Sequence, residues 1–231
     1  MVKTKTFNPV AVFLSLFLAW VFFFPGLGAA DTGKTWVPLG TAEKRVGDGH
    51  GDGEKEPALT VTHSTENNLN LKLTNKGFFV SERKENSQSY KVLQMGKYNG
   101  ELKPGYPNLP TIRQYIYIPG GKTARVHVNP GQAVTFDNYR VYPVQPPWFD
   151  GNNPGCAGFY VDDSVYNADR VFPSDMAYIG EVERIRGRNI ALLHVCPFRY
   201  NPGRKVLEVY PDIDVQVTFE GEKIPVMSRV R

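Results

Sequence analysis

The sequence of 231 residues is poor in the residue types that carry out enzyme chemistry, with only two cysteines and four histidines. It has no closely spaced cysteine pairs, no His-Glu-x-x-His sequence and no glycine-rich phosphate loop followed by a helix. These absences argue against zinc enzymes and nucleotide-binding enzymes. We therefore expect no cofactor and no metal ion.

The sequence also lacks a run of basic residues, although its net charge is +4. A mean hydropathy of −0.35 with 22% charged residues is typical of a soluble globular chain. Residues 1–30 hold two lysines and no acidic residue, so their removal would lower the net charge to +2. A nearly neutral chain offers nucleic acid little attraction, and we expect no such partner.

Only one long hydrophobic run is present, from Val10 to Phe24, and it is shorter than the roughly 20 residues that a membrane-spanning helix needs. Lys3 and Lys5 precede the run, and small residues end at Ala30. This order predicts a secretory signal peptide over residues 1–30. The chain is then secreted, periplasmic or at the cell surface, and touches the membrane only before cleavage.

Glycine and charged residues dominate residues 31–57, which we expect to form a flexible leader. Asp48, His50 and Asp52 suggest a metal-binding loop. However, Glu54 and Glu56 come too early in the sequence to complete the calcium-binding pattern. A solvated linker fits the segment better.

Short runs of alternating apolar residues, separated by Gly, Pro and Asn turns, fill the sequence from Ala58 onward. No stretch shows a sustained helical period. We predict an all-β domain over residues 58–222, an antiparallel β-sandwich of the jelly-roll or Ig-like kind with little helix, followed by a tail over residues 223–231. The predicted strands are 58–63, 69–74, 90–95, 112–118, 124–128, 133–141, 178–186, 190–196, 206–210 and 213–219, the last four as a meander.

His194 and Cys196 lie two apart on one predicted strand, which suggests a Cys-His catalytic dyad. Neighbouring side chains on one face of a strand point in parallel rather than toward each other, and Pro197 follows at once. We therefore interpret His194 as a strand histidine with a local hydrogen-bond partner, and we expect no catalytic residue in this chain.

Cys156 and Cys196 both lie in the exported part, where a disulfide is permitted. Cys156 follows a loop rich in Gly, Asn and Pro, whereas Cys196 ends an apolar strand. A disulfide between them is one interpretation, and two unpaired thiols are the other, because the sequence does not give their separation.

An ordered series of motifs lies between Leu93 and Glu220. It begins with Pro104-Gly105-Tyr106-Pro107-Asn108-Leu109-Pro110 and continues with Tyr166-Asn167, Arg170-Val171-Phe172-Pro173, Arg184-Ile185-Arg186-Gly187, Pro197-Phe198-Arg199-Tyr200-Asn201-Pro202 and Val206-Leu207-Glu208-Val209-Tyr210. In this order the series resembles the N-terminal propeptide of gingipain-type cysteine peptidases.

The resemblance implies a β-sandwich prodomain that binds a caspase-like cysteine peptidase domain and keeps it latent or helps it fold. The sequence ends at Arg231, soon after the region of resemblance. We therefore expect either a free-standing inhibitor or the front piece of a precursor, with the catalytic domain as its partner.

In that family, a basic residue from a loop before the Tyr-Asn segment is thought to enter the specificity pocket of the peptidase. The matching stretch, 145–158, holds no Lys or Arg. Its candidate partner-binding residues are Trp148, Phe149, Asp150, Asn152 and Asn153. An aromatic anchor would suit a hydrophobic pocket, although the two rings could instead cap the end of the sandwich.

A different class of function stays open beside this one. Exposed aromatic residues such as Trp148 and Tyr160 could serve a secreted β-sandwich module that binds a cell-surface protein or a glycan.

Overall fold

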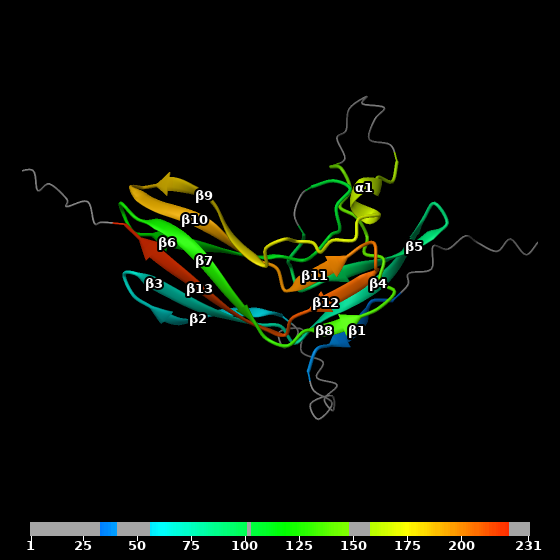
Figure 1. The fold of residues 1–231 in the computed structure, drawn as a ribbon, viewed down its shortest axis with the longest axis horizontal. Coiled ribbons are helices and arrows are strands. Elements are labelled where there is room, and N and C mark those ends of the chain that lie inside the picture. Colours follow the sequence, from blue (N-terminus) through cyan, green and yellow to red (C-terminus); the bar gives the residue numbers. More distant parts are fainter. Residues whose placement is uncertain (1–32, 41–55, 101–102, 148–157, 222–231) are drawn as a thin grey trace, which may run out of the picture. The chain divides into compact units, whose positions relative to one another are not determined.

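The computed structural model describes residues 33–40, 56–100, 103–147 and 158–221. These residues form strands and a single four-residue helix, as Figure 1 shows. The elements are β1 (Thr35–Pro38), β2 (Ala58–Ser64), β3 (Asn68–Thr74), β4 (Gly77–Glu85), β5 (Gln88–Gln94), β6 (Ile112–Ile118), β7 (Thr123–Pro130), β8 (Val134–Phe136), α1 (Asp163–Tyr166), β9 (Ala177–Ile185), β10 (Arg188–Val195), β11 (Phe198–Asn201), β12 (Val206–Val209) and β13 (Asp212–Glu220).

The strands form four sheets, with the orders β1-β4-β5, β2-β3-β13-β7, β6-β10-β9 and β11-β12-β8. All of the pairings within these sheets are antiparallel. The prediction of an all-β, antiparallel sandwich-like fold with little helix is therefore confirmed.

Two pairs of sheets divide the described part into two halves (Figure 1). In the first half, β2-β3-β13-β7 faces β6-β10-β9, and β7 lies close to β9. In the second half, β1-β4-β5 faces β11-β12-β8, where Phe78 makes edge-to-face contacts with Phe136 and Phe198. One hydrophobic core runs through both halves.

The regular alternation of β13 shows why the sequence forms this core. Ile213, Val215, Val217 and Phe219 are buried, whereas the aspartates and Gln216 between them are exposed. Successive side chains of a strand point to opposite faces, so one face of β13 packs inward and the other meets water.

Four of the connections between the halves are only two or three residues long: residues 75–76, 131–133, 196–197 and 210–211. We call these residues the junction. Their backbones bond to one another and to adjoining strand ends: Asn75 N donates to Pro211 O at 2.6 Å, Tyr210 N to Pro197 O at 2.9 Å and Gly131 N to Asp212 O at 2.9 Å. Asn75 is 1% exposed, and its Oδ1 accepts a hydrogen bond from Gly77 N.

The structure differs from the predicted strands in several places, and of the predicted strand 133–141 only Val134–Phe136 forms, as β8. Residues 77–85 and 198–201, which were not predicted as strands, form β4 and β11. Residues 35–38, inside the expected leader, pair with β4 as β1. The predicted meander is wrong, because the chain changes sheet at Pro197 and Pro211 and places β10, β12 and β13 in three different sheets.

We expect the substitution Asn75→Ala to lower the free energy of unfolding by about 1–3 kcal/mol, because it leaves the buried N–H of Gly77 without its acceptor. Urea denaturation measures this change. Lys76→Ala is the matched control, since Lys76 is exposed and its backbone carbonyl still accepts from Leu39 N. Equal stabilities for the two variants would contradict this role of Asn75.

Candidate functional site

The two ends of the 148–157 segment are fixed by one side chain. Gln145 Nε2 donates to the carbonyl of Tyr160 at 3.0 Å, and its Oε1 accepts from Tyr160 N at 2.9 Å. A single amide side chain thereby pairs with the backbone across the opening of the loop, as a neighbouring strand would. We call residues 103–108, 142–147 and 158–162 the loop base.

Gly105, from the first motif of the series, lies at the centre of the loop base. Its N–H donates to Val144 O at 2.8 Å, and its carbonyl accepts from Asp162 N at 3.2 Å. Its φ of +82° favours glycine, and an added Cβ would lie 2.6 Å from the Tyr160 ring. Only glycine lets the three segments of the loop base approach so closely.

The loop base packs on a small, mostly aromatic core of Tyr90, Tyr142, Val165 and Tyr166, to which it contributes Tyr142 itself. The hydroxyl of Tyr166 donates to the Val141 carbonyl at 2.6 Å, and burial raises the pKa of Tyr166 far above its usual value. The ring therefore stays neutral and acts as a structural donor. The Arg140 guanidinium lies over the rings of both Tyr90 and Tyr166.

Two aspartates fix the segment around α1. Asp162 caps the helix, and hydrogen bonds from Ser164 hold its pKa below the usual range. Asp169 accepts from Arg204 Nε at 2.8 Å, Arg204 Nη2 at 3.0 Å and Asn201 Nδ2 at 2.8 Å. These bonds, led by that of Arg204, lower the pKa of Asp169 and attach the segment to the turn between β11 and β12.

The predicted partner-binding residues, Trp148, Phe149, Asp150, Asn152 and Asn153, lie outside the described residues, as does Cys156. Cys196 is buried within the junction, with its Sγ 3.4 Å from Phe198 O. The disulfide therefore stays a prediction. The signal peptide of residues 1–30 also lies outside the described residues.

In the structure, His194 contacts Tyr178, whereas Cys196 Sγ contacts the Pro110 and Phe198 carbonyls. The His194 ring stacks on Tyr178 with centroids 4.3 Å apart, and its Nδ1 lies 3.1 Å from the tyrosine hydroxyl. Cys196 is 4% exposed. This geometry agrees with the interpretation of His194 as a strand histidine with a local partner.

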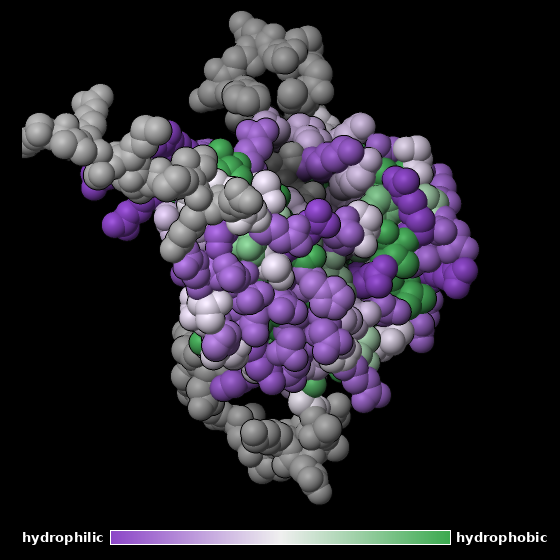
Figure 2. Space-filling model, turned by 60° about the vertical axis from the view of Figure 1, so that its left-hand side comes forward, coloured by the Kyte–Doolittle hydropathy of each residue, from purple (hydrophilic) through white to green (hydrophobic). Residues whose placement is uncertain are grey.

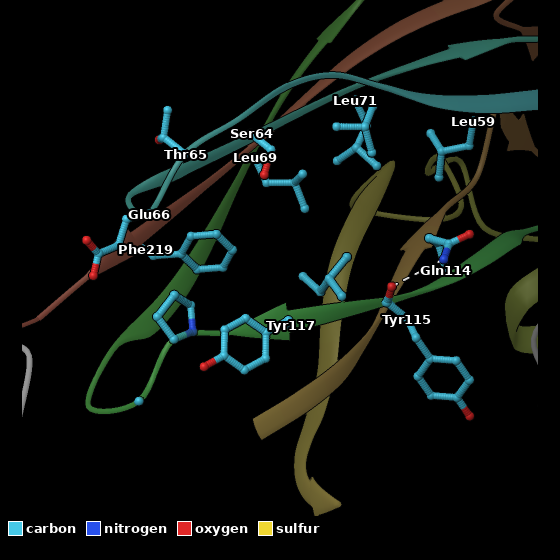
Figure 3. Close-up of a pocket in the computed structure, with 14 residues that line it drawn as sticks. Leu59, Ser64, Thr65, Glu66, Leu69, Leu71, Gln114, Tyr115, Tyr117 and Phe219 are labelled. Atoms are coloured by element: carbon cyan, nitrogen blue, oxygen red, sulfur yellow. Dashed lines mark hydrogen bonds between the residues drawn. The ribbon is translucent and has the colours of Figure 1, made fainter. Parts of the chain in front are cut away.

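A second candidate site, which the sequence did not predict, is an open cleft of about 600 Å³ between the β2–β3 hairpin and β6. Figure 3 shows Leu59, Leu69 and Leu71 projecting from the hairpin toward β6, with the Tyr115 ring directed away. In the view of Figure 2 the described surface is mostly hydrophilic; the largest hydrophobic strip lies at the right, and smaller hydrophobic patches are scattered elsewhere.

The cleft is open because inward-facing residues of β2 and β6 are not covered by other side chains of the described residues. Val61 pairs with the buried Leu71 and so faces inward, yet it is 59% exposed. Gln114 occupies the same inward face of β6 as Ile112 and Ile116, and it is exposed too. A polar residue at an inward position of an otherwise alternating strand is the one signal in the sequence that could have indicated this opening.

Within the described part of the chain, no helix is long and apolar enough to cross a membrane. In the same residues, no group of three or more His, Cys, Asp or Glu side chains is arranged to hold a metal ion.

Known proteins resemble this chain at the level of family and fold. The family described as Propeptide_C25 matches residues 51–229. Lys-gingipain of Porphyromonas gingivalis is 25% identical over 122 residues, which cover 51% of this chain and 7% of the relative. Gingipain R2 of the same organism is 25% identical over 118 residues, covering 51% of this chain and 16% of the relative.

Two solved structures from the same organism share the fold. One concerns the zymogenic latency of gingipain K, with a TM-score of 0.65, 17% identity, and coverage of 82% of this chain and 100% of the other. The second is a complex of the RgpB pro- and mature domains, with a TM-score of 0.64, 16% identity, and coverage of 74% and 90%.

We expect Gln145→Ala to speed hydrogen exchange of the Tyr160 amide by roughly tenfold, because the amide loses its acceptor. Exchange measured by mass spectrometry or NMR tests this. Gln132→Ala, at an exposed glutamine before β8, should leave the Tyr160 amide unchanged. An unaltered rate in Gln145→Ala would mean that the side chain does not hold the loop base.

The lowered pKa of Asp169 predicts a pH dependence. A carboxyl whose folded pKa lies below its unfolded value near 4 contributes stability above that value, and this contribution is lost as pH falls through the folded pKa. The stability difference between the native protein and Asp169→Asn should therefore shrink as pH is lowered from about 6 to about 3.

Urea midpoints across this pH range measure the difference. Asp137→Asn, at an exposed carboxylate after β8, is the control and should match the native protein throughout. A difference for Asp169→Asn that does not change with pH would contradict the role given to the Arg204 and Asn201 hydrogen bonds.

Proposed function

Because the chain belongs to the Propeptide_C25 family, we propose that it is an exported propeptide domain that binds a gingipain-type cysteine peptidase and keeps it latent. The match of this family over residues 51–229 is the observation that carries the proposal. The chain spans 7–16% of the length of the curated gingipains named above. The peptidase is therefore proposed as a partner domain, whether on a separate chain or downstream.

Zymogenic latency is the subject of the solved gingipain K structure, and we carry that role over to this chain as part of the proposal. We propose export through a signal peptide over residues 1–30, a propeptide domain over residues 58–222 and a tail over residues 223–231. The chain itself performs no proteolysis in this proposal. Its Cys196 is buried, and the His194 ring stacks on Tyr178.

The loop over 148–157 is the proposed contact with the peptidase. A loop that enters a cleft binds tightly only if it loses little conformational entropy on binding. A base that holds both ends of the loop in place reduces that loss. The pairing of Gln145 with Tyr160 and the packing around Gly105 support such a base. Trp148 and Phe149 are the proposed anchors, because aromatic side chains dominate the energetics of such contacts.

We expect the purified chain without residues 1–30 to inhibit the mature domain of a gingipain with an inhibition constant in the micromolar range or lower, corresponding to about 8 kcal/mol or more. Trp148→Ala should raise this constant by about tenfold or more. Hydrolysis of a peptide substrate, followed at increasing concentrations of the chain, measures both values.

Tyr117→Ala is the matched control, since Tyr117 is 55% exposed and lies on β6, outside the loop base. Its inhibition constant should stay within about twofold of the native value. Full peptidase activity at about 100 μM of the chain, a concentration well above the expected constant, would rule out the proposed role.

A secreted module that binds a cell-surface protein or glycan is the second candidate, and Tyr160 of the loop base, which is 45% exposed, favours it. Glycan binding that disappears with Trp148→Ala, in a chain that does not inhibit the peptidase, would support this alternative.

A further inference from the structure

The cleft between β2 and β6 lies on the open side of the first half. On the opposite side β7 lies close to β9, whereas β2 and β6 are the outer strands of their sheets among the described residues. Every second residue of an outer strand directs its backbone N–H and C=O away from the sheet. The Tyr115 carbonyl accepts a hydrogen bond from the side chain of Gln114 at 3.2 Å.

The cleft has the form of a sandwich from which one strand is missing. Its lining is mostly apolar, and inward-facing Val61 and Gln114 are exposed. Filling it would bury these positions and give the outward backbone groups of β6 a partner. The remaining question is which segment occupies it.

The chain itself continues from the edge of the cleft. Phe219, near the end of β13, lines the cleft together with Pro119 and Gly120. Gly221 follows closely, and a Cβ added there would lie 2.6 Å from the Gly121 carbonyl. Residues 222–231, which lie outside the described residues, thus begin beside the cleft.

We infer that residues 222–231 turn back after Gly221 and add to β6 as an antiparallel strand that fills the cleft. The β6–β7 turn and the end of β13 lie together, since Glu220 pairs with Thr123. A chain that reverses there runs antiparallel to β6. The two residues between Gly221 and Ile224 allow three backbone steps, which span the roughly 10 Å between facing sheets; the eight residues from Ile224 to Arg231 extend about 26 Å, enough for the seven residues of β6.

In this arrangement, apolar and polar residues of the added strand lie opposite residues of the same kind on the inward face of β6. If Ile224 lies opposite Ile118, then Val226 faces Ile116, and Ser228 faces Gln114. Residues directly opposite one another share a face of the sheet. The polar residue at the inward face of β6 therefore meets the polar residue at the inward face of the added strand, and apolar residues meet apolar ones.

The outward face is compatible as well. Pro225 falls opposite Tyr117 and has no N–H to donate to the outward carbonyl of Tyr117, so this pair keeps the single bond from Tyr117 N to the Pro225 carbonyl. Met227 falls opposite Tyr115, which is 67% exposed, and sulfur contacts with aromatic rings are favourable. Arg229 falls opposite Arg113, and these like charges weaken the pairing at the far end of the added strand; the Arg113 Nη2 is bonded to the Gly100 carbonyl at 2.8 Å.

Hydrogen exchange of the β6 amides tests this inference, which does not depend on the proposed function. Two proteins with the same N-terminus are compared: the chain through Arg231 and a chain ending at Gly221. We expect outward amides of β6 to exchange about tenfold more slowly in the longer chain, because each pairing adds a backbone hydrogen bond.

Substitutions within the longer chain provide the matched comparison. Ile224→Asp combined with Val226→Asp should return β6 to the fast exchange of the shorter chain, because it places carboxylates in the apolar cleft. Met227→Asp, on the outward face, should retain most of the protection.

Equal exchange of β6 in the longer and shorter chains would overturn the inference. Slow exchange in the shorter chain that depends on protein concentration would overturn it too, since a second copy would then occupy the cleft. Equal effects of the inward and outward substitutions would also contradict it, because the proposed register would be wrong.

Discussion

The hydrogen-bonded junction is the constraint on which the rest of the structure depends. Four connections pass between the halves there, and two of them contain Pro197 or Pro211, which lack an N–H and supply carbonyls that accept bonds from Tyr210 and Asn75. A buried polar backbone group without a partner is costly. Each connection must therefore lie where its neighbours can bond to it, and this fixes the positions of the strands that leave it.

The two halves that meet at the junction are closed to different degrees. In the second half, aromatic rings around Phe78 fill the space between the sheets, and the loop base lies over a further aromatic cluster around Tyr166. In the first half, the side of β7 and β9 is closed while the side of β2 and β6 is open. The described part therefore offers two separate surfaces, the hydrogen-bonded loop base and the open cleft between the β2–β3 hairpin and β6.

Local pattern explains what the sequence could predict. Residues 112–118 form β6 with the predicted bounds, because the alternation is clear and a Pro-Gly-Gly turn follows. Residues 77–85 were missed because Gly77, Phe78, Phe79 and Val80 form a continuous apolar run rather than an alternating one. Such a run fits a strand that is covered on both faces, and Trp36 packs on Phe79 to cover the second face.

The candidate sites depended on contacts that local pattern does not contain. The motif from Pro104 to Pro110 was recognised as a resemblance, but its role in the loop base follows from the approach of Val144 and Asp162 to Gly105. The cleft follows from the sheet order, which leaves β2 and β6 as outer strands of the described sheets. Both depend on pairings between distant parts of the chain, which single-strand periodicity does not reveal.

The conformational entropy lost on closing the loop shows how little the Gln145 side chain contributes through loop length. The bonds of Gly105 to Val144 and Asp162 already close a loop of about 17 residues, and the Gln145–Tyr160 pairing shortens it to about 14. Because closure entropy varies only with the logarithm of length, this change is worth about 0.2 kcal/mol. The main effect of the two hydrogen bonds of Gln145 is therefore on the direction of the chain, because they fix where residues 146–147 leave the loop base and where residues 158–159 return to it. A binding loop needs that property more than shortness, since the geometry of its anchors decides whether they reach a cleft.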